Sequence, residues 1–205
     1  MLAKFPAALL GANLRSLSLG PSAFENCEAT VRHQCQAHLL SCFEPSMAPG
    51  STSGVPASVS ATLHALTSLS LSDTMPAMAG QLCAALSALT DLRSLTLRKL
   101  RIIAAMAKQL AASVALMVDL RALDVSDNRL RDAGMCTLCS KLGVLRHLAT
   151  LRLQHNDASE RGAQAVLQAV RGLTAVSCVS LSGVQQDSPA LAALRAMPRL
   201  LELSR

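Results

Sequence analysis

A spacing of aliphatic residues recurs along the chain. Leucine or valine occupies the first, fourth and sixth places of "LRALDV", which begins at Leu120, and of "LATLRL", which begins 28 residues later at Leu148. Further copies of this spacing begin at Leu14, Leu66, Leu92, Val176 and Leu200. Alternating apolar and polar residues are typical of a short strand with one buried face. Each copy is therefore predicted to open with such a strand.

The second half of each copy changes to helical spacing. In the copy that begins at Leu120, apolar residues lie three or four places apart, at Leu138, Leu142 and Leu145. The next copy matches them with Val166, Val170 and Leu173. A strand followed by a helix, repeated at a fixed period of this size, is the signature of a solenoid.

The pattern L-x-x-L-x-L-x-x-N-x-L, completed by a helix in about 28 residues, resembles the leucine-rich repeats of the ribonuclease-inhibitor-like class. The resemblance covers nearly all of residues 14–203 and is strongest over 92–175. It implies an α/β solenoid, a horseshoe segment with parallel strands on the concave side and helices on the convex side.

The ninth-place asparagine of this family is present as Asn128 and Asn156. Its amide is expected to satisfy backbone groups at the turn that leaves the strand. Turns without it are expected to be looser or rearranged, at Thr74, Leu100 and Val184. A glycine falls at the fifteenth place in three copies, where a small residue permits close backbone approach, at Gly80, Gly134 and Gly162.

We predict a single leucine-rich-repeat domain over residues 1–205, with about six repeats. The expected copies are 14–65 with an insertion, 66–91, 92–119, 120–147, 148–175 and 176–199, followed by a truncated copy at 200–205. The stretch "EPSMAPGSTSGVPAS" (44–58) is rich in Pro, Gly and Ser, which predicts a flexible loop. Neither end shows a polar cap, so end-to-end self-association and membership of a longer array both stay open.

The charge of the chain is concentrated in its middle. The chain has 19 Lys and Arg against 13 Asp and Glu, and residues 92–161 hold twelve of the former and six of the latter. A basic excess of this kind either attracts acidic proteins, nucleic acid or a membrane surface, or only keeps the surface of the protein solvated. Aromatic residues make up 1% of the chain, with no Trp or Tyr, so the stacking rings typical of nucleic-acid binding are missing and we do not expect nucleic acid as a partner.

The seven cysteines are not spaced as in a secreted disulfide scaffold, which favours a reduced, cytoplasmic location. Cys136 and Cys139 form a C-x-x-C on a predicted helix, and we interpret them as a buried, inert pair. No metal or cofactor is expected, because the Cys and His spacings match no zinc signature. The uncharged stretch 74–90 is too short and too polar to span a bilayer, so no membrane association is expected.

In the resembled family, the residues between the strand leucines face the concave surface. The eighth places read Asp73, Lys99, Asp127 and His155, and these charges either neutralise each other or form a recognition strip. Arginine is favoured at binding hot spots. The predicted partner-binding residues are Arg93, Arg98, Lys99, Arg121, Asp124, Asp127, Arg152 and His155.

No phosphate-binding, metalloprotease or nucleophile-elbow motif occurs in the chain, so we predict a protein that is not an enzyme. The predicted function is a protein–protein interaction scaffold that binds a protein partner on its concave face. One alternative is a regulator (activator) of a small GTPase, because Ran GTPase-activating proteins have similar repeats, although their acidic tail is missing here. A sensor fragment of a NOD-like receptor is another, although no nucleotide-binding segment supports it.

Overall fold

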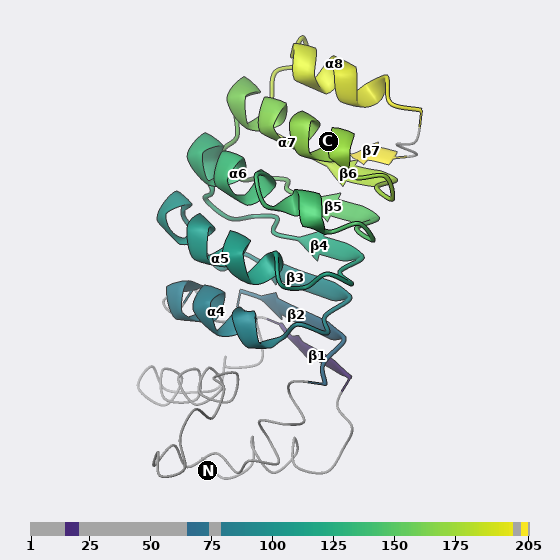
Figure 1. The fold of residues 1–205 in the computed structure, drawn as a ribbon. Coiled ribbons are helices and arrows are strands. Elements are labelled where there is room, and N and C mark those ends of the chain that lie inside the picture. Colours follow the sequence, from purple (N-terminus) through teal and green to yellow (C-terminus); the bar gives the residue numbers. More distant parts are fainter. Residues whose placement is uncertain (1–14, 21–64, 74–78, 199–201, 205) are drawn as a thin grey trace, which may run out of the picture.

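The computed structural model describes residues 15–20, 65–73, 79–198 and 202–204. Within them, strands follow one another in chain order in a seven-stranded parallel sheet. The strands are β1 (Ser16–Leu19), β2 (Ser68–Ser72), β3 (Ser94–Arg98), β4 (Ala122–Asp124), β5 (Thr150–Arg152), β6 (Cys178–Ser180) and β7 (Glu202–Ser204). Because each strand pairs with the strand of the next copy, the copies stack in one direction (Figure 1).

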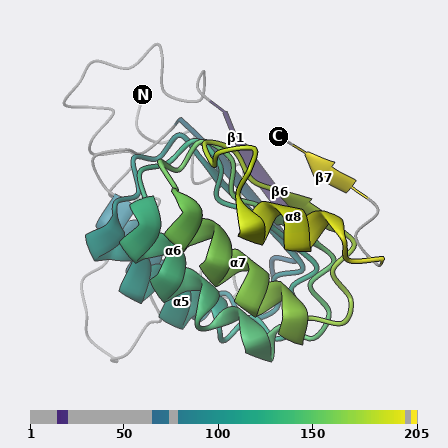
Figure 2. The same cartoon turned by 90° about the horizontal axis from the view of Figure 1, so that it is seen from above.

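Helices connect the strands and stack in the same order. They are α4 (Ala79–Ala85), α5 (Ala107–Val114), α6 (Arg131–Cys139), α7 (Glu160–Gly172) and α8 (Pro189–Arg195). Short 3-10 turns lie beside them: η3 (Leu86–Ala88), η4 (Ala104–Met106) and η5 (Leu142–Val144). The view from above shows α5, α6 and α7 on one side of the strands (Figure 2). No described helix covers the other side, which is called the open face below.

The strand leucines align in one interior row. The parallel register places Leu69 beside Leu95, Leu95 beside Leu123, and Leu123 beside Leu151. All four are fully buried. Burying one leucine side chain contributes roughly 1.5–3 kcal/mol, so this row and its counterparts are the main cohesive force between copies.

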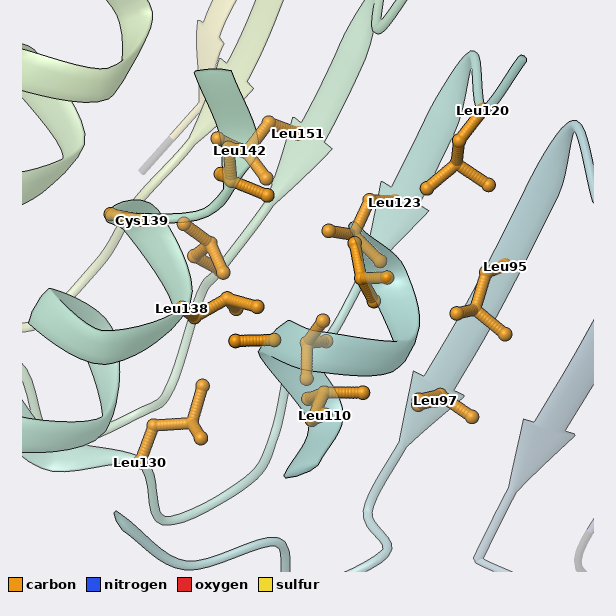
Figure 3. Close-up of a cluster of buried hydrophobic side chains, with 14 of the residues drawn as sticks. Leu95, Leu97, Leu110, Leu120, Leu123, Leu130, Leu138, Cys139, Leu142 and Leu151 are labelled. Carbon is orange, nitrogen blue, oxygen red and sulfur yellow. The ribbon is translucent and has the colours of Figure 1, made fainter. Parts of the chain in front are cut away.

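The helix leucines close the core from the other side. Leu138, Leu142 and Leu145 are fully buried, as their spacing predicts. However, α6 ends at Cys139, and Leu142 lies in η5, so the helical face continues through a tighter turn. Figure 3 shows Leu110, Leu138 and Leu142 facing the strand residues Leu95, Leu123 and Leu151 across a core without rings.

The predicted α/β leucine-rich-repeat solenoid is therefore confirmed, with strands on one side and helices on the other. The single-domain assignment and the boundaries of the copies stay predictions. The loop predicted at 44–58 lies outside the described residues. Over the part of the chain that the structure describes, no helix combines the length and the apolarity needed to cross a membrane.

Candidate interaction surface

Asn128 organises the turns that follow β3 and β4. Its side chain is 4% exposed. The Nδ2 group donates to the carbonyl oxygens of Leu97, at 2.7 Å, and of Val125, at 2.9 Å. The Oδ1 atom accepts from the backbone N–H groups of Leu100 and Ile102, both at 3.1 Å. One buried amide thus ties its own turn to the strand and turn of the preceding copy.

Asn156 repeats this arrangement one copy later. Its Nδ2 donates to the carbonyl oxygen of Val125 at 2.9 Å and to that of Leu153 at 3.1 Å. Its Oδ1 accepts a longer bond, of 3.5 Å, from the backbone of Leu130. The two asparagines therefore link three consecutive copies where the strands end.

The turn at Leu100, expected to be looser or rearranged, is hydrogen-bonded through the asparagine of the following copy. Leu100 is fully buried, and its backbone N–H is satisfied by Asn128 from the following copy. The asparagine therefore serves the turn before its own as well. Thr74 lies outside the described residues, and Val184, where the ninth place lacks asparagine again, is half-buried after Gly183.

In the five copies whose eighth place the structure describes, this place has left-handed backbone geometry, which the sequence reading missed. The φ angles there are 53°, 54°, 58°, 53° and 84°, at Asp73, Lys99, Asp127, His155 and Gly183. Glycine adopts this region freely, and Asp, Asn and His are enriched there among other residues. The recurring choice of these residue types was the available signal, and the lysine is the exception to it.

The eighth-place charges do not pair along their column, contrary to the neutralisation that we considered. In the described residues Asp127 instead binds Arg98, with 2.8 Å between Oδ2 and Nη2. The hydrogen bond to Asp127 raises the pKa of Arg98 above its usual value. His155 contacts Ser182, whose Oγ accepts from the backbone N–H at 2.7 Å and lies 3.3 Å from the ring Nδ1.

The fifth-place residues form a continuous row across β2 to β6, with Asp124 directly beside Arg152 in the register. The Oδ1 atom of Asp124 accepts from both the backbone N–H and the hydroxyl of Ser126, at 3.0 and 2.5 Å. Arg152 is exposed. The carboxylate is therefore held in place, whereas the neighbouring guanidinium faces solvent.

Arg93 and Arg121 lie side by side where β3 and β4 begin. The backbone N–H of Arg121 donates to the carbonyl oxygen of Arg93 at 2.8 Å, and both side chains are exposed. Among the eight predicted contact residues, the structure thus brings together three pairs: Arg93 with Arg121, Arg98 with Asp127, and Asp124 with Arg152. Lys99 and His155 are exposed but lie two copies apart, with the Asp127 copy between them.

The fifteenth-place glycines differ in how tightly they are surrounded. A Cβ on Gly134 would lie 3.2 Å from the backbone Cα of Ala104, and one on Gly162 would lie 2.8 Å from the Oδ1 atom of Asp132. At Gly80 the nearest atom would be the Cε of Met106, at 3.8 Å, which leaves room for a methyl group.

The sequence reading also missed a carboxylate that caps the helix of the next copy. Asp132, in the first turn of α6, accepts from the backbone N–H groups of Ser159, at 2.8 Å, and Gly162, at 3.0 Å. Its Oδ2 atom accepts from the Ser159 hydroxyl at 2.6 Å. Although burial raises the pKa of Asp132, the hydrogen bonds from Ser159 and Gly162 hold it below its usual value.

Of the four cysteines that the structure describes, Cys83 and Cys139 are buried, whereas Cys136 and Cys178 are half-buried. Burial raises the pKa of Cys139 to about 12, and that of Cys83 likewise. Cys136 is half-buried and lines, with Cys139, an open cavity of about 340 Å³ between α6 and α7. In the described residues, no group of three or more His, Cys, Asp or Glu side chains could hold a metal ion.

No family model and no curated protein matches the chain. Among the solved structures that are similar to it, two illustrate the low identity of the matches. Actin-binding site 2 of leiomodin-1 is 11% identical, with 64% of this chain and 77% of that one covered and a TM-score of 0.48. An internalin (InlF) of Listeria monocytogenes str. 4b F2365 is 15% identical, with a TM-score of 0.25; the match covers 73% of this chain and 57% of the internalin. Neither likeness bears on the partner or activity of this chain.

Proposed function

We propose that this chain is a non-enzymatic interaction scaffold that binds a protein partner on the open, concave face of its sheet. The proposed contact residues are Arg93, Arg98, Lys99, Arg121, Asp124, Asp127, Arg152 and His155. They come from three neighbouring copies, those that begin at Leu92, Leu120 and Leu148.

The observation that carries the proposal is the contrast between the two faces of these strands. Leu97 and Leu151 are fully buried, whereas Arg98 and Arg152, the next residues on the same strands, are exposed. The row of buried leucines and the hydrogen bonds of Asn128 and Asn156 hold the backbone that carries these arginines. A rigid frame reduces the entropy lost when a partner binds, and arginine is favoured at hot spots.

The described side chains do not favour catalysis. His155 and Ser182 are the nearest approach to a nucleophile and its base, but the Ser182 oxygen already accepts the backbone N–H of His155. No described residue hydrogen-bonds the second ring nitrogen of His155, so the orienting group of a triad is missing there. The thiols of Cys83 and Cys139 stay protonated at neutral pH because burial raises their pKa to about 12.

The surface has the dimensions of a protein-binding site. Neighbouring strands are ~4.8 Å apart, so seven strands span roughly 29 Å. A partner of one small domain would cover that width.

Nothing in the described residues favours a regulator of a small GTPase or a NOD-like sensor over a general scaffold. The finer ribonuclease-inhibitor-like class, the cytoplasmic location and end-to-end self-association are parts of the same proposal.

The test is a charge reversal with a matched control. The variant Arg93→Glu/Arg121→Glu/Arg152→Glu changes the open face, and Lys108→Glu/Lys141→Glu/Arg146→Glu makes the same change of net charge elsewhere. The control cations are exposed in or after α5 and α6, and no described hydrogen bond or salt bridge uses their side chains.

Affinity purification with quantitative mass spectrometry is performed on all three proteins. We expect a set of partners that the wild type and the control retain and that the open-face variant loses by at least tenfold. If the open-face variant retains the partners of the wild type, the assignment of the site to this face is wrong.

A further inference from the structure

A second surface, which shares only Lys99 with the contact residues proposed above, lies in the turns that follow β3 and β4. It is formed by Lys99, Arg101, Ile103, Arg129 and Arg131, which we name the edge patch. We propose that the edge patch binds an acidic segment of a partner protein, one that carries an apolar side chain among its carboxylates. This surface goes beyond the open face of the sheet and adds Arg101, Ile103, Arg129 and Arg131 to the residues used there.

The two turns of the edge patch are fixed beside one another by their backbones. Ile103 and Arg129 form an isolated parallel bridge, and the N–H of Arg129 donates to the carbonyl oxygen of Ile102 at 2.8 Å. The N–H of Arg131 donates to the carbonyl oxygen of Asn156, also at 2.8 Å. The edge patch is thus presented by backbone that is hydrogen-bonded to neighbouring turns on both sides.

The positive charge of the edge patch is not used within the described part of the molecule. Its four cationic side chains are exposed, and no described hydrogen bond or salt bridge engages them. Two nearby carboxylates are already engaged, Asp127 with Arg98 and Asp132 with the start of α7. The exposed flanking carboxylates, Asp73 and Asp157, belong to the copies on either side. Four cations therefore face solvent together between them.

Three of these cations sit on backbone that disfavours any side chain. Lys99, Arg101 and Arg131 have φ angles of 54°, 56° and 54°. Glycine adopts this region without a steric penalty, and Lys and Arg lack the short polar side chain that lets Asp and Asn tolerate it. Non-glycine residues held in this region cluster at active sites and ligand clamps. Three long cations at such positions on one edge point to a role for their charge.

The composition of the edge patch selects the chemistry of its partner. Cations attract carboxylates or phosphates, but the chain has no Trp or Tyr to stack on bases. Ile103 is 42% exposed between the cations, which favours a partner with its own apolar side chain.

The size of the edge patch sets the length of the peptide. Two neighbouring turns, ~4.8 Å apart, face about three extended residues at ~3.3 Å per residue. An acidic peptide of eight residues is therefore long enough to cover the edge patch.

The experiment measures binding of a fluorescein-labelled octapeptide of Glu and Asp with one central Leu, by fluorescence anisotropy at low ionic strength with the full chain. The variant Arg101→Glu/Arg129→Glu/Arg131→Glu is compared with Lys108→Glu/Lys141→Glu/Arg146→Glu, which has the same net charge. We expect the dissociation constant to rise at least tenfold in the first and less than threefold in the second. An equal rise in both, or no binding by the wild type, overturns the proposal.

Two further arms separate the alternatives. Labelled polyuridine of similar charge tests nucleic acid, and tighter binding of it than of the peptide by the wild type overturns the proposal. The variant Arg101→Gly/Arg131→Gly relieves the backbone, so we expect an unchanged or higher melting temperature together with peptide binding weakened about fivefold. A lower melting temperature with unchanged binding shows that these arginines serve the fold, which also overturns it.

Discussion

Replacing Asn128 by Ala should destabilise the chain more than any other single change in the turns. The substitution removes the acceptor for the backbone N–H groups of Leu100 and Ile102, two residues that are fully buried. It also removes the donors to the carbonyl oxygens of Leu97 and Val125. A buried donor without a partner costs about 1–3 kcal/mol. Two such donors are left here, and water that enters the turn partly satisfies them. We therefore expect the free energy of unfolding to fall by about 3 kcal/mol.

Asn156→Ala is the matched comparison for this prediction. Its Oδ1 atom accepts one long bond, of 3.5 Å, from Leu130, so fewer strong bonds are lost. We expect a loss of about 1.5 kcal/mol, half of that at Asn128. Urea titration followed by circular dichroism gives both free energies of unfolding by linear extrapolation. If Asn128→Ala costs less than Asn156→Ala, or less than about 1 kcal/mol, the bridging role of Asn128 is refuted.

The remaining predictions concern the helix starts and the thiols. The lowered pKa of Asp132 means that its stabilisation is present above the usual carboxyl pKa, which is about 3.9, and is lost as the pH falls through the folded value. Asp132→Asn should therefore cost about 1 kcal/mol at pH 7 and progressively less below pH ~4, and urea titrations that show the same cost at pH 7 and pH 3 would contradict this. Gly162→Ala should lower the melting temperature because its Cβ would lie 2.8 Å from a carboxylate oxygen, whereas Gly80→Ala, with its nearest contact at 3.8 Å, should leave it unchanged or raise it; equal effects would count against the packing described. With Ellman's reagent at pH 8, half-buried Cys136 should react faster than Cys139, whose pKa is about 12, as judged by comparing the two Cys→Ser variants.

The register of the sheet could be predicted from the sequence because it depends on residues that repeat. Leu95, Leu123 and Leu151 occupy the same place in successive copies, and burying all three on one side allows a single alignment. The helical spacing likewise predicted that Leu138 and Leu142 are buried. The helical spacing is a local pattern that a single copy already contains, and the register required only the recurrence of one place from copy to copy.

Features that depend on contacts between copies could not be read in the same way. Asn128 serves the turn at Leu100, in the preceding copy, and Asp132 caps the helix that begins after Ser159, in the following copy. A carboxylate near a helix start is ordinarily assigned to its own helix, so no local pattern pointed to a partner 27 residues ahead. The same holds for charges. Arg98, at the seventh place of its copy, forms a salt bridge with Asp127, at the eighth place of the next copy.

The central claim is that the open face of the sheet, and not the helical side, receives a protein partner. Site-specific photocrosslinking tests it most directly, with benzoylphenylalanine placed at Arg152 on the open face or at Lys108 on α5, both exposed. With a partner identified by affinity purification, we predict a covalent adduct from position 152 and none from position 108. An adduct from position 108 alone would contradict the claim.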